Sequence, residues 1–339
     1  MAIHRIRTID AHAAGEPLRL VTEGFPAPVG ASMLDKRAWF REHWDWLRTA
    51  LMHEPRGHAD MYGAVLTEPC SDAAHAGVLF MHNEGYSTMC GHGVVAVCTI
   101  ALERGLISVP GEPPVIALES PAGLVRARAV RAAPTREDPA PARVSAVAFE
   151  NVPSFVYRAG LPVEANDRTL PVDVAFGGAF YAIVDSEAVG IPLRRESLAA
   201  LRRTGMEIAR AVERVLKVRH PLNGGLEGVY GTVFTGMAEG EADLRNVTIF
   251  ADRQVDRSPC GTGTAAVMAV LDAMGLLDTE RPFAHESLAG TLFRGRLLRR
   301  TTVGDHEAIV PEIEGSAWIT GEHTFLIDDA DPLRHGFLL

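Results

Sequence analysis

Apolar and polar residues alternate along the chain in short runs, and only a few segments have helical periodicity. An apolar run at 76–82 predicts a buried strand, and Ser32 resembles the N-cap of a helix whose apolar residues repeat at near-helical spacing. Further helices are expected at 91–104, 195–218 and 261–274. Because strand patterns outnumber helix patterns, the sequence predicts an α+β fold rather than a doubly wound one.

The length of the chain points to two domains. A chain of 339 residues is too long for one ordinary hydrophobic core and suits two domains of about 150 residues each. The segment 132–142 is rich in proline and charge, which predicts a linker or a long surface loop. No apolar run approaches the ~18 residues of a membrane span, and the charged start argues against a secretion signal.

One motif occurs twice. The segment beginning Cys90-Gly91-His92-Gly93 matches the segment beginning Cys260-Gly261-Thr262-Gly263 in the shared pattern C-G-x-G-x-x-A-V. The two cysteines are separated by half the length of the chain, and each opens an apolar helix. A single C-G-x-G would be weak evidence, whereas one copy in each expected domain indicates a duplicated α/β unit with two matching helix starts.

A cysteine at a helix start lies at the positive end of the helix dipole, beside backbone N–H groups that can bind a carboxylate. The dipole lowers the pKa of a thiol, and the glycines allow a ligand to approach the backbone. If two such helix starts faced one small carboxylate, one thiolate could remove a proton from a carbon and the other thiol could return one. This is the chemistry of a two-base racemase or epimerase, which requires no cofactor.

Composition narrows the choice of partners. The net charge of -10 and the pI of about 5.7 disfavour nucleic acid and anionic membranes as partners. Lys36 and Lys217 are the only lysines, so Schiff-base chemistry has few candidates. The four cysteines include no C-x-x-C pair, which argues against a structural zinc site. Four cysteines in a chain this long also argue against a secreted disulfide framework, and free thiols fit a reducing cytoplasm. We expect the protein to use no metal and no cofactor. The sequence leaves open whether it forms a homodimer.

Beyond this chemistry, the sequence resembles the proline racemase family, which includes proline racemases, 4-hydroxyproline 2-epimerases and trans-3-hydroxy-L-proline dehydratases. The matching segments are DAHAAGEP at 10–17, EPRGHADMYGA at 54–64, MCGHG at 89–93 and DRSPCGTG at 256–263. The resemblance implies a diaminopimelate epimerase-like fold of two pseudo-symmetric lobes, each a curved sheet around a central helix. It places 1–130 and 318–339 in an N-terminal lobe with Cys90, and 131–317 in a C-terminal lobe with Cys260.

The resemblance also implies roles for individual residues. Cys90 and Cys260 would be the paired acid and base acting on a small cyclic amino acid, proline or a hydroxyproline. The remaining substrate-binding residues would be Gly91, His92, Gly261 and Thr262 for the carboxylate, Asp256 for the ring nitrogen, and Tyr62 and Phe250 for aromatic walls. Alternatives stay open, because Asp256 can instead cap the following turn, and Tyr62 and Phe250 can be ordinary core residues.

The branch of the family is a separate question. Two cysteines match the racemase and epimerase pattern, whereas the dehydratases usually carry threonine at the second position. Other segments resemble the dehydratases, including HNEGYS at 82–87, YGT at 230–232 and the C-terminal residues 328–339. We favour inversion at Cα of proline or a hydroxyproline because chemistry follows the site. Dehydration of trans-3-hydroxy-L-proline to Δ1-pyrroline-2-carboxylate is the alternative.

Two other classes of protein fit part of the pattern. A thiol hydrolase could use Cys90 with a histidine as base, but it would leave the second C-G-x-G motif unexplained. A binding protein could use the same helix starts to hold an anion, but it would not need thiols.

Overall fold

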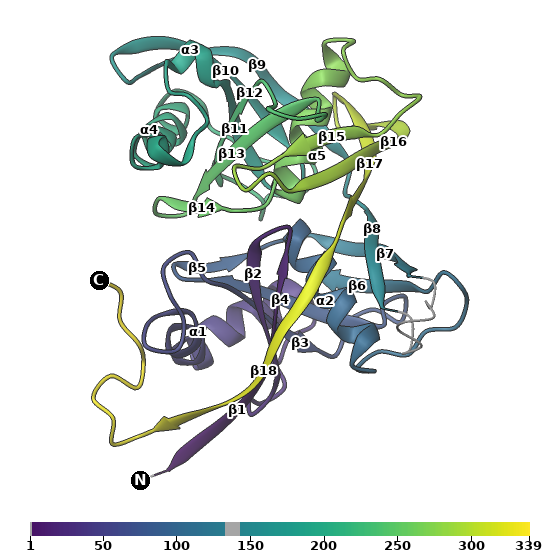
Figure 1. Ribbon diagram of the computed structural model, residues 1–339, viewed down its shortest axis with the longest axis vertical. Helices are drawn as coiled ribbons and strands as arrows, with labels where there is room; N and C mark the ends of the chain where they lie inside the picture. Colours follow the sequence, from purple (N-terminus) through teal and green to yellow (C-terminus); the bar gives the residue numbers. More distant parts are fainter. Residues whose placement is uncertain (1, 133–142) are drawn as a thin grey trace. The chain divides into compact units, whose positions relative to one another are not determined.

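The computed structural model describes residues 2–132 and 143–339, and the chain divides into two compact units, 1–149 with 315–339 and 150–314 (Figure 1). The elements of the first unit are β1 (Ile3–Ala13), β2 (Glu16–Glu23), α1 (Met33–Met52), β3 (Tyr62–Thr67), β4 (Ala76–His82), β5 (Gly85–Ser87), α2 (Gly91–Glu103), β6 (Val115–Ser120), β7 (Gly123–Arg131), β8 (Val144–Glu150) and β18 (Ala317–Asp328).

The second unit contains the remaining elements. They are β9 (Ser154–Ala165), β10 (Arg168–Phe176), β11 (Phe180–Asp185), α3 (Ser186–Val189), a 3-10 turn (Arg195–Ser197), α4 (Leu198–Val215), β12 (Gly231–Gly236), β13 (Leu244–Phe250), β14 (Gln254–Asp256), α5 (Gly261–Ala273), β15 (Phe283–Glu286), β16 (Leu292–Val303) and β17 (His306–Gly315).

The two units repeat one strand topology. In the first, β1 pairs antiparallel with β2, β2 parallel with β3, β3 antiparallel with β4, β4 parallel with β6, and β6 antiparallel with β7. In the second, β10, β11, β12, β13, β15 and β16 follow one another with the same sequence of orientations. The short strands β5 and β14 also correspond, because β5 pairs antiparallel with β4 and β14 pairs antiparallel with β13. The duplication predicted from the repeated motif is therefore present in the topology.

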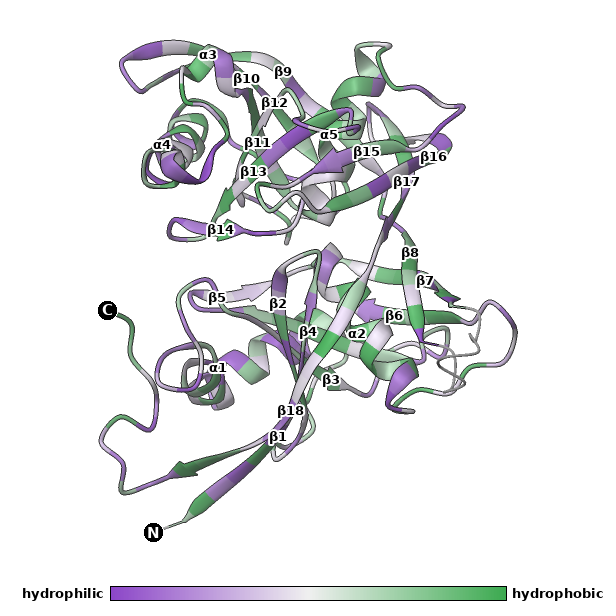
Figure 2. Ribbon diagram, in the orientation of Figure 1, coloured by the Kyte–Doolittle hydropathy of each residue, from purple (hydrophilic) through white to green (hydrophobic). Residues whose placement is uncertain are grey.

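Each unit buries one apolar helix. In the second unit, β16 pairs with β17, β17 with β9 and β9 with β10, so that eight strands close into a ring. Helix α5 packs against β9, β10, β11 and β16, and residues 261–270 are all buried. Helix α2 packs likewise on β1, β2, β3, β7 and β18, with 91–101 buried. Figure 2 shows the difference between these apolar helices and α4, whose surface is mixed.

The outer helices α1 and α4 each bury one apolar face. Ser32 caps α1 in a capping box with Asp35, as the sequence predicts, and Leu47 and Leu51 lie in the core beneath the helix. Helix α4 places Leu201, Ile208 and Val212 against the sheet and leaves its arginines outside. The predicted strand at 76–82 and the predicted helices at 91–104 and 261–274 are confirmed to within a residue or so. Among the described residues, no helix is long and apolar enough to cross a membrane.

The boundary between the units differs from the one expected from sequence. It falls at 149/150 and 314/315, rather than at 130/131 and 317/318. The reason is that β8 belongs to the first unit, so the proline-rich segment 132–142 connects β7 and β8 within one unit instead of linking two. Residues 133–142 lie outside the described residues, but the N–H of Ala132 donates to the carbonyl of Arg143 at 2.7 Å, next to the ends of both strands.

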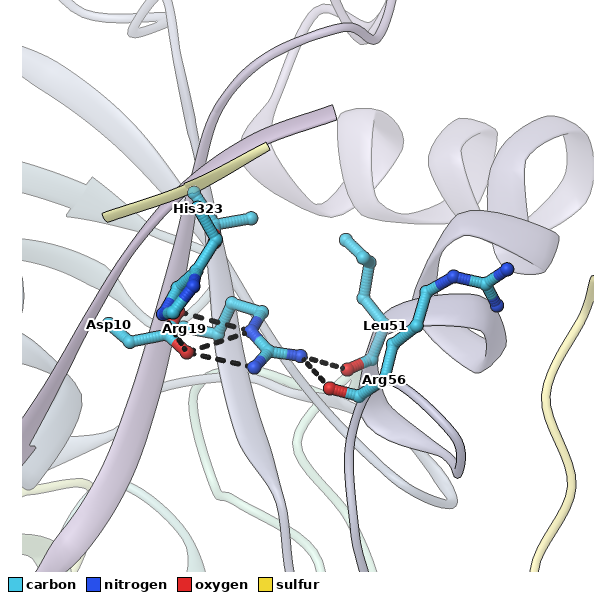
Figure 3. A network of polar contacts seen from close by, with 6 residues as sticks. Asp10, Arg19, Leu51, Arg56 and His323 are labelled. Carbon is cyan, nitrogen blue, oxygen red and sulfur yellow. Dashed lines mark hydrogen bonds and ion pairs between the residues drawn. The ribbon is translucent and has the colours of Figure 1, made fainter. Parts of the chain in front are cut away.

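A buried ion pair ties three strands of the first unit to the end of α1 (Figure 3). Arg19 on β2 donates to both carboxylate oxygens of Asp10 on β1, at 2.8 to 3.1 Å. The same guanidinium donates to the carbonyls of Leu51 and Arg56 and lies 4.4 Å above the ring of Phe325 on β18. Its side chain is 8% exposed, so these partners replace nearly all of its water.

We expect Arg19→Met to lower the free energy of unfolding by about 3 kcal/mol or more, because it leaves the Asp10 carboxylate buried without its cation. Urea denaturation followed by circular dichroism measures the effect. The matched control is Arg7→Met, which removes an ion pair with Glu23 between the same two strands, where both side chains are more than 60% exposed. That change should cost no more than about 0.5 kcal/mol. Equal losses for the two variants would contradict the importance of the buried pair.

Candidate active site

Cys90 is the N-cap of α2, as the sequence predicts. Its backbone is extended (φ -146°, ψ 114°), and its sulfur accepts the N–H of Gly93 at 3.2 Å. A side chain at position 93 could not fit, since a Cβ there would lie 2.5 Å from Phe80 and 3.0 Å from the sulfur. The thiol is 5% exposed. The glycine at the third helical position is therefore what lets the thiol approach the helix start.

His92 and Tyr62 lie beside this thiol. The two ring nitrogens of His92 lie 3.2 Å and 3.5 Å from the Cys90 sulfur. The ring of Tyr62, at the start of β3, meets the His92 ring edge-on with centroids 4.7 Å apart, and its hydroxyl is hydrogen-bonded to Ser87. An imidazole at this distance can exchange a proton with the thiol. The sequence drew attention to the backbone N–H of His92, whereas the structure also places its side chain at the sulfur.

Cys260 is the N-cap of α5, but its backbone differs. It has φ 61° and ψ 105°, in the left-handed half of conformational space. Its sulfur accepts the N–H of Gly263 at 3.4 Å, and lies 3.7 Å from the hydroxyl of Tyr181 and 3.8 Å from that of Thr262. The two hydroxyls are themselves hydrogen-bonded at 2.6 Å. The second thiol is therefore approached by two hydroxyl groups, whereas the first is contacted by an imidazole.

Burial is the main influence on the second thiol. Burial and, to a smaller extent, the nearby Asp256 carboxylate together raise the pKa of Cys260 to about 12, although hydrogen bonds from Gly263, Tyr181 and Thr262 act in the opposite direction. Burial also raises the pKa of Tyr181, whose hydroxyl therefore stays protonated. At neutral pH the Cys260 thiol keeps its proton and is suited to donate it.

Asp256 ends β14, close to Cys260. Its Oδ1 accepts the N–H of Ser258 at 2.8 Å and the Ser258 hydroxyl at 2.7 Å. The Ser258 oxygen in turn accepts the N–H of Cys260 at 3.1 Å. Asp256 does cap the turn before the thiol, which was the alternative role considered for it. Binding of a substrate nitrogen by the same carboxylate stays a prediction.

Three aromatic rings form a row that begins with Tyr181 beside the second thiol. Phe250, the last residue of β13, stacks on Tyr230 with centroids 5.4 Å apart, and Tyr230 meets Tyr181 edge-on at 5.9 Å. The role of Phe250 as an aromatic wall stays a prediction, whereas Tyr181 was not predicted from the sequence. Nothing in the apolar run of β11 marks this tyrosine, because its contact with Cys260 depends on how β11 packs beside α5. Tyr230 stood in a segment noted only for its resemblance to the dehydratases.

The structure thus forms two groups from the predicted residues. One, within the first unit, consists of Cys90, Gly91, His92 and Tyr62, and the other, within the second unit, consists of Cys260, Gly261, Thr262, Asp256 and Phe250. Within residues 2–132 and 143–339, no group of three or more His, Cys, Asp or Glu residues is placed to hold a metal ion. The groups can bind an anion at backbone N–H groups and can transfer protons through sulfur.

Comparison with known proteins identifies the family to which this chain belongs. The chain belongs to the proline racemase family, whose model matches residues 8–338. It is 49% identical over 333 residues to a trans-3-hydroxy-L-proline dehydratase of Bacillus cereus, covering 98% of this chain and 97% of the relative. It is 40% identical over 335 residues to a proline racemase of Acetoanaerobium sticklandii, covering 98% of both.

Solved structures show the same fold. A hydroxyproline epimerase from Agrobacterium vitis with bound trans-4-hydroxy-L-proline is 29% identical, with a TM-score of 0.88 over 99% of this chain and 96% of that chain. A probable proline racemase from Agrobacterium radiobacter K84 with bound carbonate is also 29% identical, with a TM-score of 0.89 over 98% of this chain and 96% of that chain. The chain is thus related both to proteins named for inversion and to proteins named for dehydration.

The protonated state of Cys260 leads to a pH test. Alkylation by iodoacetamide follows the thiolate fraction, so the rate at Cys260 should keep rising about tenfold per pH unit from pH 8 to pH 10. Peptide-resolved mass spectrometry measures this rate in the folded protein. The control is the same cysteine in urea-unfolded protein, where the rate should level off near about pH 9. A folded-state rate that levels off by about pH 8 would contradict a raised pKa.

Proposed function

We propose that this protein is a cofactor-independent racemase or epimerase that inverts Cα of proline or a hydroxyproline. The observation that carries the proposal is the pair of thiols that cap the buried helices of two units with the same topology. Cys90 and Cys260 are the acid–base pair. One thiolate takes the proton from Cα, the bond electrons delocalise into the carboxylate, and the other thiol gives its proton to the opposite face of the planar carbon.

Binding of the substrate is assigned to the helix starts. The first turn of a helix offers N–H groups for which the helix itself has no carbonyl acceptor, and they favour a negative charge. In this proposal, the N–H groups of Gly91, His92, Gly261 and Thr262 hold the carboxylate and stabilise the charge that develops on it. Asp256 binds the ring nitrogen, and the rings of Tyr62 and Phe250 form apolar walls.

The surroundings of the two thiols favour different starting protonation states. The His92 imidazole beside Cys90 can accept the thiol proton, while burial leaves Cys260 protonated. We therefore propose that Cys90 is the resting base and Cys260 the resting acid. One inversion reverses these states, because Cys90 gains the Cα proton and Cys260 gives up its own, and the substrate enantiomer that reacts first is the one whose Cα–H faces Cys90.

Support for the proposal comes from the relatives as well as from the site. Membership of the proline racemase family agrees with acid–base chemistry at Cα. The related epimerase of known structure was crystallised with trans-4-hydroxy-L-proline, a molecule that has both the carboxylate and the ring nitrogen required here. We also propose that the repeated sheet around a central helix represents the diaminopimelate epimerase architecture, and that the two lobes follow the boundaries of the two units.

Dehydration is the second candidate, and the 49% identical dehydratase of Bacillus cereus favours it. In that reaction Cys90 would remove the Cα proton of trans-3-hydroxy-L-proline, and Cys260 would protonate the departing 3-hydroxyl group, which leaves as water. The enamine product would isomerise to Δ1-pyrroline-2-carboxylate. The same thiol at position 260 therefore serves both candidates, and only the group that receives its proton differs.

Proton NMR in D2O separates the candidates in one experiment. The protein is incubated in turn with L-proline, trans-4-hydroxy-L-proline and trans-3-hydroxy-L-proline. Inversion gives the epimer with deuterium at Cα, whereas dehydration removes the signals of the 3-hydroxylated ring and releases water. We expect inversion with at least one substrate. Loss of water from trans-3-hydroxy-L-proline without inversion of any substrate would make dehydration the function.

Replacement of either thiol tests the acid–base pair. We expect Cys90→Ser and Cys260→Ser each to lower the rate of inversion by about 10²- to 10⁴-fold, because a serine hydroxyl is a far weaker acid than a thiol. A serine can still cap the helix, so circular dichroism and the thermal midpoint should change little. One variant can retain exchange of Cα deuterium on a single face. Substantial inversion by either variant would rule out the two-thiol mechanism.

Removal of metals tests the proposal that no cofactor is needed. We expect full activity after exhaustive dialysis against EDTA, with no added pyridoxal phosphate, since sulfur and backbone N–H groups supply all the chemistry proposed. The control is the same protein dialysed without chelator. Activity that is lost with EDTA and restored by one divalent metal would contradict this part of the proposal.

A further inference from the structure

The two helix-capping thiols hold different backbone conformations. Cys90 is extended, with φ -146°, while Cys260 has φ 61°, which only glycine adopts without cost. A residue other than glycine in such a conformation is disfavoured by about 1–3 kcal/mol and persists only when its surroundings hold it. Something around the second thiol must therefore fix its backbone, and nothing comparable is required at the first.

A buried polar network lies directly behind Cys260. His285 on β15, Asn246 on β13 and Thr264 on α5 are each no more than 1% exposed. The side-chain amide of Asn246 donates to the carbonyl of Pro259 at 2.9 Å, and the Thr264 hydroxyl donates to the same carbonyl at 3.1 Å. His285 bridges these two side chains, with Nε2 3.0 Å from Asn246 and Nδ1 2.9 Å from Thr264.

Counting donors and acceptors fixes the tautomer of His285. The amide nitrogen of Asn246 has two protons, so it donates one to Pro259 and the other to Nε2, which must be unprotonated. The hydroxyl proton of Thr264 goes to Pro259, so its oxygen accepts a proton from Nδ1. The imidazole is then neutral with its proton on Nδ1, and every group in the network is satisfied. Burial keeps it neutral by lowering its pKa to about 3.

The network acts on the peptide group that leads into the thiol. The Pro259 carbonyl and the Cys260 N–H belong to one planar peptide unit. Two side chains hold its oxygen, and the Ser258 hydroxyl accepts its N–H at 3.1 Å. Three hydrogen bonds thus fix the orientation of this plane, from which the Cys260 side chain departs.

The first unit provides an internal comparison. Asn246 and Val78 are both the third residue of equivalent strands, and Thr264 and Val94 both lie four residues after the capping cysteine. His285 pairs in parallel with the first residue of β13, as Leu118 does with the first residue of β4. Val78, Val94 and Leu118 are all fully buried. The fold therefore needs only apolar side chains at these three positions. The polar residues Asn246, Thr264 and His285 occur only in the unit whose capping cysteine has a positive φ.

We propose that His285, together with Asn246 and Thr264, is a positioning network that locks the Pro259–Cys260 peptide and thereby sets the orientation of the Cys260 thiol. The sulfur is hydrogen-bonded to Tyr181, Thr262 and Gly263 and to none of these three side chains, so their effect on it passes through the peptide. The importance for turnover rests on the function proposed above. The effect on the thiol itself does not, and it can be measured without a substrate.

The test transplants the residues of the first unit into the second. The variants are His285→Leu and the triple variant Asn246→Val, Thr264→Val and His285→Leu, which replaces the polar set by the hydrocarbon set found behind Cys90. Releasing the peptide should let the thiol reach water, so alkylation of Cys260 by iodoacetamide at pH 8 should be about tenfold faster than in the wild type. Alkylation of Cys90 in the same samples should not change.

Thr232→Val is the matched control. Thr232 is fully buried in the same ring of strands, but its hydroxyl donates to Gly205 on α4, and so the change removes a buried hydrogen bond without touching the network. Its Cys260 reactivity should equal that of the wild type. If the variants turn over, kcat should fall about 10- to 100-fold with little change in KM, because positioning affects the reacting group and not substrate affinity. Unchanged Cys260 reactivity in both transplant variants would overturn the proposal.

A second measurement needs no variant. Nitrogen-15 NMR of histidine-labelled protein should show one histidine with its proton on Nδ1 and no titration between pH 5 and pH 8. The signal is assigned to His285 by its absence in His285→Leu. A proton on Nε2, or titration in that range, would overturn the network. If the wild type inverts no substrate while these results hold, the proposed function fails and the positioning network stands.

Discussion

The contact on which the structure depends is the hydrogen bond from a glycine N–H to a cysteine sulfur at the start of each buried helix. Residues 91–101 of α2 and 261–270 of α5 are buried, so the first turns of these helices have little water available to satisfy their backbone donors. The sulfur accepts the N–H of Gly93 in one and of Gly263 in the other. Each glycine is required because a side chain there would press against the sulfur. The same few atoms therefore begin the helix and position the thiol at its first turn.

Duplication gave the two units one topology, but the surroundings of their thiols have diverged. An imidazole contacts Cys90, whereas two hydroxyl groups approach Cys260. Hydrocarbon supports the first cap, and a hydrogen-bonded network supports the second. These differences are electrostatic as well as steric, because a neighbouring imidazole can take a thiol proton and a dry, hydroxyl-lined environment retains it. Two identical residues in repeated units thus have different surroundings, which would suit them to the opposite roles proposed for them.

Much of this arrangement could be predicted from the sequence, and the part that could not has a physical reason. The capping cysteines, the buried helices and the strand at 76–82 are marked by short-range patterns of glycine and apolar residues. Tyr181 and His285 carry no such mark, because their contacts depend on strand pairing far along the chain. The boundary between the two units could not be predicted for a related reason, because the composition of 132–142 allows both a linker and a long surface loop. That composition indicates a surface connection, but it cannot show that the strands on both sides of the segment belong to the same unit.

The choice of cysteine at both caps is itself an argument about chemistry. Serine, threonine, aspartate and asparagine are the residues that favour the N-cap, and a thiol is only a weak hydrogen-bond acceptor. At Ser32 and Asp185, where a cap serves only its helix, this chain uses the common residues. At positions 90 and 260 it uses cysteine, although a hydroxyl would cap as well or better. Capping therefore does not explain the sulfur. The proposed proton transfer would, because a thiol loses its proton far more readily than a hydroxyl and can still return it.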